Sequence, residues 1–412
     1  MTWLPEWRVT VGDDIYTTVT ACSYSTGRLN IDDQCTAGYS RVEIINTDNA
    51  PFTIDITDHL QLELKNSAGT YVTVFTGEVS DFSIGVKSPN DFGYVTTGTI
   101  LGVGNLSKLT KTYYQHALPE ELDGAQIAAI FNDALSGAWN EVAPTLTWAT
   151  YPPTVQWQNA ESAYGVIDAG LYNMVDVAAG NYKSNILADQ IASSALGQIY
   201  ETPDGLINYD DADHRSTYVA TYGSKELSGL YATPNTIKSQ LQIAKIRNSE
   251  IVRYGQNYVH TLELTDTDSI ANYGLYQRKY DSNVKSLTDV TDIVTRDLAL
   301  RAVPRNQFGA ITFRLDNTEL PNNLRDDLIS VFFGEPVVIT NLPTNMFNGY
   351  FDGFIENITM NSTPQYVDLT LYLSPLDFSL VAPTWETVIP NNIIWSGVNA
   401  TLQWSKAIGV LN

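Results

Sequence analysis

The stretch Phe75-Thr-Gly77-Glu-Val79-Ser-Asp81-Phe-Ser-Ile84 recurs near the other end of the chain. The second copy reads Phe351-Asp-Gly353-Phe-Ile355-Glu-Asn357-Ile-Thr-Met360. An aromatic residue, a glycine, a β-branched residue and an Asp or Asn residue recur at the same offsets. The copies start at residues 75 and 351, a separation of 276 residues that is far too long for a solenoid or propeller repeat.

The similarity extends outward from both copies. Leu60 to Leu64 precedes the first copy and Val337 to Ile339 precedes the second, and residues 94–100 and 366–372 follow them. This pattern predicts two similar all-β domains with different material between them. Because a duplicated domain can place similar surfaces around an axis, it favours a ring-building structural protein over an enzyme with a single pocket.

Length and charge narrow the classes of function. The chain has 412 residues, enough for about two to four domains. Its 23 Lys and Arg residues against 46 Asp and Glu residues give a net charge of −23. Such a charge disfavours wrapping of duplex DNA, because neutralising phosphates requires clustered basic residues. It fits a surface past which DNA slides, and it equally fits a protein that the charge merely keeps in solution.

Membrane and redox signals are sparse. No run approaches the ~20 apolar residues of a membrane helix, and residues 1–8 lack the basic and apolar regions of a signal peptide, so we expect no membrane insertion. Cys22 and Cys35 make neither a disulfide framework nor a zinc site. They could form one bridge across paired strands, but a reducing cytoplasm favours free thiols.

Residues 1–110 are expected to form a first β-barrel domain. Short alternating runs separated by turn residues are typical of a sandwich or a small barrel. We expect strands at residues 7–11, 16–20, 40–45, 60–64, 72–86 and 94–103.

Residues 111–235 change to a mixed α/β pattern and are expected to form an insert domain. Pro119 and the two glutamates after it predict a helix start, and Ser184 to Gly197 predicts a second helix. Asp204-Gly205 between two apolar runs predicts a hairpin over residues 198–209. Residues 138–158 hold three Trp and three Pro, which predicts an irregular packed loop or short strands.

Strands return over residues 236–378, which are expected to form a second β-barrel domain. Runs at residues 251–254 and 258–262 predict two of its strands. One helix is predicted over residues 286–301, because Ser286 and Asp289 resemble a capping box and Pro304 limits the helix. Its single apolar stripe should pack against a barrel. Residues 379–412 are expected to form a short C-terminal β arm. Taken together, these segments predict a fold class that is mainly β (α+β).

No catalytic motif is present in the sequence. It contains no Gly-x-Ser-x-Gly, His-Glu-x-x-His, Walker or dinucleotide-binding glycine pattern. Of His59, His116, His214 and His260, only His214 ends an acidic run, Asp210-Asp-Ala-Asp213-His214. This run could bind a divalent cation through oxygen ligands, but it lacks the glycine and distal glutamate of a calcium loop. We therefore expect a solvated loop there, and no catalytic, cofactor or metal site.

Other charged residues allow two explanations each. Asp266 with Asp268 and Asp326 with Asp327 could serve a glycosidase, although such pairs more often lie in turns or helix caps. Four basic residues could meet acidic partners across an interface, whereas surface salt bridges are the simpler explanation: Arg28, Arg41, Arg278 and Lys279.

Over about residues 8–380, the order of these features resembles the tail hub family of tailed bacteriophages, also called baseplate hub or tail-associated minor tail proteins. Residues 24–30, Tyr-Ser-Thr-Gly-Arg-Leu-Asn, resemble a Gly-Arg segment of that family. In the family a turn follows this segment, and Gly38-Tyr39 matches that turn here. Residues 75–81 resemble its frequent Phe-x-Gly-x-Val-x-Asp strand. Two later features also match in order: residues 197–200 before Asp204-Gly205 and Arg215, and Tyr273-Gly274 before helix 286–301 and Pro304.

The resemblance implies a structural role without catalysis. Hub proteins form homotrimers in which each subunit supplies two related barrels, so three subunits make a pseudo-sixfold ring. The ring adapts the tail tube to the tip and lets DNA pass during genome ejection. The implied location is the virion tail tip, after assembly in the host cytoplasm. The implied partners are a distal tail protein, a tape-measure protein and other minor tail proteins, and DNA passes without specific binding. The chain ends at residue 412 without the hydrolase or receptor-binding domains of some longer members, so we expect no lytic role.

Two other classes of function stay open from the residues alone. The 24 Tyr, 8 Trp and many acids also fit a polysaccharide-binding or cleaving β protein, such as a tail-tip depolymerase or a carbohydrate-binding module. Such a protein should show a groove lined by Tyr and Trp, and a cleaving one should lose activity when an acid pair is neutralised. A secreted adhesin is the third class, and it should carry a secretion signal.

Overall fold

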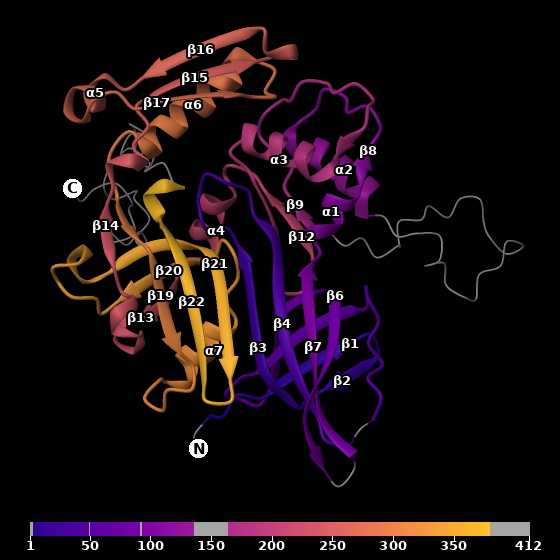
Figure 1. The fold of residues 1–412 in the computed structure, drawn as a ribbon. Coiled ribbons are helices and arrows are strands. Elements are labelled where there is room, and N and C mark those ends of the chain that lie inside the picture. The colour runs from indigo at the N-terminus through magenta and orange to yellow at the C-terminus, as the bar shows by residue number, and fades with distance from the viewer. Residues whose placement is uncertain (1–2, 49, 91–92, 136–163, 380–412) are drawn as a thin grey trace, which may run out of the picture.

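The computed structural model describes residues 3–48, 50–90, 93–135 and 164–379. The predictions for residues 138–158, for the helix end at Gly137 and for the arm beyond residue 379 lie outside these ranges. Figure 1 shows a body of long strands, with a smaller group of helices and strands at one end.

The first strand-rich segment forms the strands that the sequence predicts. Their bounds are β1 (Trp7–Val11), β2 (Asp14–Tyr16), β3 (Val19–Gly27), β4 (Thr36–Asn46), β5 (His59–Lys65), β6 (Tyr71–Asn90) and β7 (Gly93–Gly104). The run predicted at residues 16–20 is divided, since residues 17 and 18 separate β2 from β3. Side chains of β1 alternate between buried and half-buried, as the period-two pattern requires.

The last segment adds strands to the same sheet. They are β13 (Lys225–Ser228), β19 (Ala310–Arg314), β20 (Pro336–Thr340), β21 (Phe351–Thr363) and β22 (Tyr366–Pro375). In the described ranges these strands and β1–β7 form one twelve-stranded sheet, because β21 pairs antiparallel with β3. The two strand sets meet edge to edge and share one hydrophobic core.

The two copies of the repeated stretch have the same strand register. The first copy lies on β6 between β5 and β7, and the second lies on β21 between β20 and β22. Phe75 opposes Leu62 of β5, and Phe351 opposes Ile339 of β20. Each glycine two residues later opposes the residue two positions earlier on the neighbouring strand. The sequence repeat is therefore also a repeat of strand pairing.

A β-bulge also recurs at the same offset in both copies. Ser80 is the extra residue where the register of β6 against β7 shifts, and Glu356 is the extra residue where that of β21 against β22 shifts. The outer strands continue the correspondence, since β7 pairs antiparallel with β4 and β22 pairs antiparallel with β19. The copies differ at the far edge, where β1 is antiparallel to β5 but β13 is parallel to β20.

Helices and small sheets lie mostly at the other end of the molecule (Figure 1). The helices are α1 (Ser107–Lys111), α2 (Asp123–Leu135), α3 (Ser184–Ser194), α4 (His214–Tyr222), α5 (Thr267–Tyr273), α6 (Leu287–Arg301) and α7 (Asn322–Ile329). The remaining strands are β8 (Tyr113–Tyr114), β9 (Tyr164–Ile167), β10 (Tyr182–Lys183), β11 (Gln198–Glu201), β12 (Ile207–Asp210), β14 (Ser239–Leu241), β15 (Ser249–Tyr254), β16 (His260–Thr265), β17 (Gln277–Asp281) and β18 (Asn306–Phe308). The hairpin predicted over residues 198–209 is confirmed as the β11–β12 pair.

Helix α6 begins as predicted but packs elsewhere. The Ser286 side chain accepts a hydrogen bond from the Asp289 backbone N–H, which confirms the cap. The apolar stripe with Val290 and Val294 belongs to a second core, together with Val252 of β15 and residues of α2 and α3. The expectation that it packs against a barrel is wrong. The three-stranded sheet of β16, β15 and β17 offers the apolar face that the stripe covers.

The helices were compared with the length and hydrophobicity of membrane-spanning helices. Across the described ranges, none of the helices has both the length and the apolar character that crossing a bilayer requires.

Candidate functional site

The two copies meet at the end of β3, where the backbones touch. The backbone N–H of Arg28 donates to the carbonyl oxygen of Glu356 over 2.7 Å. Gly27 has a φ of +101°, and a Cβ on it would overlap the same carbonyl oxygen. Position 27 therefore requires glycine for both its conformation and the close approach.

Glu356 forms a buried ion cluster at its bulge. Its carboxylate accepts from Nε of Arg28 at 2.7 Å, from Nη1 of Arg215 at 2.7 Å and from Oγ of Ser374 at 2.6 Å. Arg215 lies on α4, so the cluster joins β3, β21 and the insert. We call Arg28, Arg215 and Glu356 the junction cluster. Its members are 4%, 8% and 4% exposed, respectively, so they are out of reach of a binding partner.

The electrostatics of the junction cluster keep it ionised. Burial acts to raise the pKa of Glu356, but the charges and hydrogen bonds of Arg215 and Arg28 outweigh it and hold the pKa well below its usual value. A carboxylate that stays ionised and fully hydrogen-bonded is a poor general acid or base. The cluster is therefore suited to holding three segments together.

A second charged group lines a cavity of about 110 Å³ beside the junction cluster. Asp297 of α6 accepts from Arg278 at 3.1 Å and from Arg247 at 3.4 Å, and Arg247 also contacts Asp32 at 2.5 Å. Among the described residues, the lining contains six arginines and five aspartates. Because the opposite charges nearly cancel, the cavity has no strong preference for an anion or a cation.

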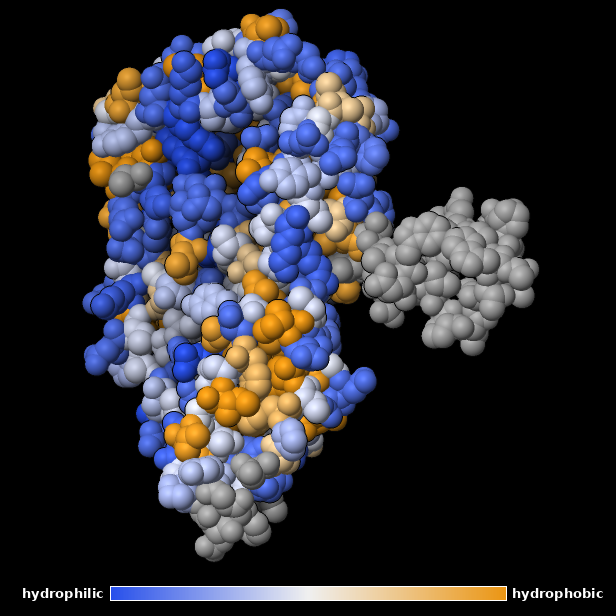
Figure 2. All heavy atoms as spheres, turned by 45° about the vertical axis from the view of Figure 1, so that its right-hand side comes forward, coloured by the Kyte–Doolittle hydropathy of each residue, from blue (hydrophilic) through white to orange (hydrophobic). Residues whose placement is uncertain are grey.

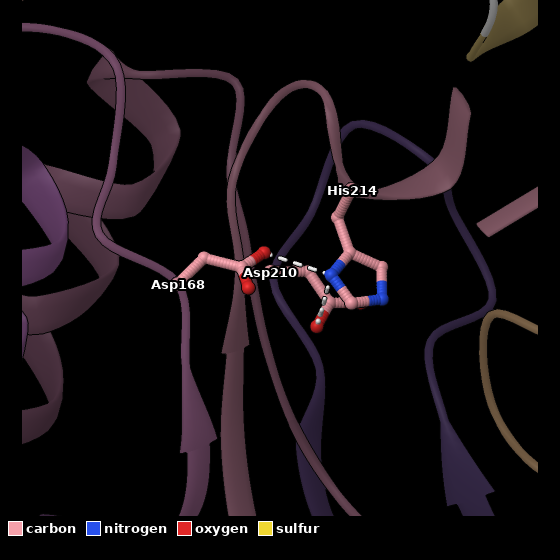
Figure 3. Close-up of side chains that lie close together, drawn as sticks. All are labelled: Asp168, Asp210 and His214. Carbon is pink, nitrogen blue, oxygen red and sulfur yellow. Dashed lines mark hydrogen bonds and ion pairs between the residues drawn. The ribbon is translucent and has the colours of Figure 1, made fainter. Parts of the chain in front are cut away.

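Asp210 and His214, from the acidic run, form a compact cluster with Asp168, a residue that the sequence did not indicate (Figure 3). Asp168 follows β9, Asp210 ends β12 and His214 begins α4. Nδ1 of His214 lies 2.8 Å from Oδ2 of Asp168 and 3.5 Å from Oδ1 of Asp210. One candidate ligand atom from each of the three residues lies within 4.8 Å of the other two.

The surroundings of His214 favour its protonated form. The hydrogen bond to Asp168 raises the pKa of His214 against the opposing effect of burial. Burial acts to raise the pKa of Asp168, but the hydrogen bonds from His214 and from the Asp211 backbone N–H, together with the charge of His214, outweigh it and lower that pKa. Burial raises the pKa of Asp210 to about 6. Because Nδ1 faces both carboxylates, a divalent cation could enter only after that proton leaves.

The predicted solvated loop at residues 210–214 is therefore wrong in part. Asp210 is 6% exposed, and its carboxylate accepts from the Tyr200 hydroxyl at 3.2 Å. Asp213 is engaged as well, since it pairs with Arg296 of α6. Asp210, at the end of β12, thus points inward while the Asp213 side chain stays half exposed, and the local sequence pattern does not reveal this difference.

The acid pairs that could serve a glycosidase have structural partners. Asp266 caps α5, because its side chain accepts from the Ser269 backbone N–H at 2.8 Å. Asp326 on α7 accepts from the Ser67 backbone N–H at 2.8 Å, which fixes the turn between β5 and β6. These two acids therefore act as a cap and a turn clamp.

The four basic residues considered for an interface differ in exposure. Arg28 is buried in the junction cluster, so it forms neither an interface contact nor a surface salt bridge. Arg41 forms an exposed salt bridge with Glu43 at 2.8 Å, and Arg278 pairs with Asp297. Lys279 is exposed on β17. Cys22 and Cys35 are free thiols, as the composition favours.

His214 also lines an aromatic groove of about 580 Å³. Its lining includes Tyr200, Tyr218, Tyr222 and Phe332, with Asp204 from the β11–β12 turn. None of the acid pairs considered for a glycosidase is part of this lining.

Sequence reasoning missed Glu356 and Asp168. Glu356 had one usable signal, since a glutamate follows the apolar pair Phe354-Ile355 where the first copy has Ser80. Asp168 had none, because it lies 46 residues from His214 in the chain.

Comparison with known proteins gives a match in structure alone. No family model and no curated protein matches the sequence. The 43 kDa tail protein of prophage MuSo2 from Shewanella oneidensis superposes with a TM-score of 0.57 at 11% identity, over 91% of this chain and 99% of that one. The tail protein from Neisseria meningitidis MC58 gives 0.59 at 11% identity, over 92% and 99%. Prophage tail protein gp18 from Listeria monocytogenes EGD-e gives 0.50 at 10% identity, over 90% and 95%. The chain therefore has the fold of phage tail proteins along nearly its whole described length.

Proposed function

We propose that this chain is a structural hub protein at the tail tip of a tailed phage, where three copies form a ring. The observation that carries the proposal is the internal repeat of strand pairing. β6 and β21 share a sequence pattern, a register and a bulge position within one sheet. Each chain thus supplies two related β units, which we interpret as two related β-barrel domains, so three chains supply six.

The fold comparison supports the same role. Three proteins described as tail or prophage tail proteins match along at least 90% of this chain. In the proposed ring, six related units match a sixfold tail tube on one face, and three chains match a threefold tip on the other. The partners that follow are a distal tail protein, a tape-measure protein and other minor tail proteins, in a virion assembled in the host cytoplasm.

The net charge of −23 fits the passage of DNA through such a ring. Like charges repel, so an acidic lumen would keep phosphates from adhering during genome ejection. A basic or neutral lumen in the assembled ring would contradict this part of the proposal.

We infer that the role is structural and not catalytic. The inference is supported by the charged residues described above, which form ion pairs, caps and turn clamps. It is tested by the location of the protein: antibody against the purified chain should label the tail ends of intact phage particles from the source. Label on capsids, or none on particles, would contradict the proposal.

The aromatic groove favours a second candidate, binding of a polysaccharide. Tyrosine rings suit the apolar faces of sugars, and Tyr218 and Tyr222 lie 4.8 Å apart between ring centroids. The groove contains no tryptophan among its described residues. Titration with host surface polysaccharide should then shift the Tyr fluorescence of the protein but not that of a Tyr218→Ala variant, and no shift would dismiss this candidate.

A further inference from the structure

One edge of β6 is open beyond its bulge. β5 pairs with β6 only over Tyr71–Glu78, whereas β7 pairs with it as far as Asn90. Among the described residues, no other strand pairs with β6 along residues 81–89, which we call the open edge of β6. A free row of backbone N–H and C=O groups is a template for another strand.

The same edge is covered in the second copy. β20 pairs with β21 over Phe351–Phe354, and β3 then takes over the edge from Asn357 to Ser362. The change of neighbour occurs at Glu356, the counterpart of Ser80. Within one chain, β21 thus shows what a covered edge looks like, and β6 shows the same edge without its cover.

The side chains repeat this contrast. Met360 is fully buried, with 0% exposed, and opposes Tyr24 of β3, whereas its counterpart Ile84 is 57% exposed. Ser362 is 7% exposed, and its counterpart Val86 is 66% exposed. An isoleucine and a valine therefore lie in solvent at two positions that the fold buries elsewhere.

The face of the molecule that carries β6 is rich in hydrophobic side chains (Figure 1, Figure 2). Figure 2 shows hydrophobic side chains concentrated on the lower part of the face that comes forward when the β6 side of Figure 1 is turned toward the viewer. Exposed apolar residues of β2, β6 and the segment before β5 include Ile15, Ile56, Ile84 and Val86. A concentration of exposed apolar side chains such as the one in Figure 2 is typical of an interaction surface.

We propose that a second copy of this chain covers the open edge of β6 with a strand, in the way that β3 covers β21. This inference rests on the proposed ring and adds the contact that closes it. The occupant follows from the repeat. The fold already contains one such contact between the two units of a chain, so the equivalent contact joins the second unit of one chain to the first unit of the next.

The strand that supplies the contact is the one in the place of β3. β3 runs antiparallel beside β4, and in the second unit residues 232–241 run beside residues 306–313, which are equivalent to β4. All three residues of β14 are exposed, and Leu241 is 62% exposed. The surface around Leu241 is thus equivalent to the edge of β3 that pairs with β21. It is the surface that we expect to bind the open edge of β6.

Two different surfaces in contact make a head-to-tail interface. Such interfaces generate closed rings when the rotation between subunits closes. Ile84 and Val86 of one chain would then be buried by residues around Leu241 of the next, and every chain would use both of its surfaces.

The test measures the oligomeric state of the purified full-length chain by sedimentation velocity. We expect a wild-type trimer, monomeric Ile84→Asp and Leu241→Asp variants, and a trimeric Val259→Asp control. Val259 is 69% exposed but follows the Gln256–Tyr258 turn ahead of β16, outside both surfaces. Unchanged circular dichroism and Tm establish that the variants are folded.

A mixing experiment tests the head-to-tail geometry. Ile84→Asp keeps an intact Leu241 surface, and Leu241→Asp keeps an intact open edge of β6. Mixed at equal concentration, the two variants should form dimers and no trimers, because one intact interface remains in each pair. Failure to form dimers would overturn the pairing of these two surfaces.

The outcomes separate this inference from the proposed function. A wild-type trimer that Ile84→Asp leaves intact would overturn the edge contact while the ring stands. A wild-type monomer at every attainable concentration, together with a ring on the tail, would also overturn it, because this contact requires no other protein. Particles without any ring of this chain would overturn the proposed function itself.

Discussion

Arg28 and Glu356 form a buried ion pair, 2.7 Å from Nε to Oε2, that joins the end of β3 to the bulge of β21. The two residues are 328 positions apart in the chain. They come from the two strand-rich segments, and Arg215 adds the insert to the same carboxylate. One carboxylate thus contacts both β units and the insert.

The first prediction concerns that carboxylate. Glu356→Gln leaves two buried guanidinium groups without their counter-charge, so we expect the free energy of unfolding to fall by about 3–5 kcal/mol. Urea denaturation followed by circular dichroism measures this loss.

Arg41→Ala is the matched control, because it breaks the exposed pair with Glu43. It should cost no more than about 1 kcal/mol. Equal effects of the two substitutions would contradict a structural role for the junction cluster.

The second prediction concerns Gly27. Its φ of +101° disfavours any side chain, and a Cβ would meet the Glu356 backbone. We expect Gly27→Ala to reduce stability by about 2–4 kcal/mol. Gly309→Ala has open space around its Cβ and no such φ, so it should change stability by less than about 1 kcal/mol. Denaturant unfolding of both variants checks the contrast, and similar losses would refute it.

The third prediction concerns Glu201 of β11 and the pH dependence of stability. Burial raises the pKa of Glu201 from 4.5 to about 7, although the backbone N–H groups of Leu106 and Gly38 act against it. The unfolded chain loses this proton at lower pH than the folded chain. The stabilisation is therefore present below pH 4.5 and is lost as the pH rises through about 7.

Glu201→Gln removes this titration. The stability of the variant relative to wild type should rise by about 2–3 kcal/mol between pH 5 and pH 8. The exposed Glu319→Gln is the control and should show no such change. A pH-independent difference for Glu201→Gln would show that burial does not govern its ionisation.

The fourth prediction concerns the proton on His214. The Asp168 hydrogen bond is the largest cause of the raised pKa of His214, so Asp168→Asn should lower that pKa. The cluster stabilises the fold below the ordinary value of 6.5, and this contribution is lost as the pH rises through the folded-state pKa. NMR titration of the imidazole measures the shift, with the exposed Asp268→Asn as control. A His214 titration that both variants leave unchanged would be evidence against the proton-held cluster.

The sequence predicted those elements whose start or turn depends on residues that are neighbours in the chain. The Ser286 cap fixes the start of α6, and the Asp204-Gly205 turn fixes the β11–β12 hairpin, because each uses residues close in sequence. The repeat around Phe75 and Phe351 was equally visible in the sequence, and the structure shows that the two copies also share their strand register.

Long-range contacts were beyond those signals. The hydroxyls of Ser25 and Thr359 lie 3.0 Å apart although 334 residues separate them, and no local pattern indicates that β3 should pair with β21. The apolar stripe of α6 shows that the helix packs on something, but it does not identify which sheet. Asp168 and Glu356 escaped for the same reason, because their partners come from distant segments.

The most direct test of the account is a cryo-EM reconstruction of the tail end of particles that carry this protein. The account predicts three copies around a threefold axis, with β6 and β21 units alternating at equal distance from the axis. A single copy, six copies, or two units at clearly different distances from the axis would contradict it.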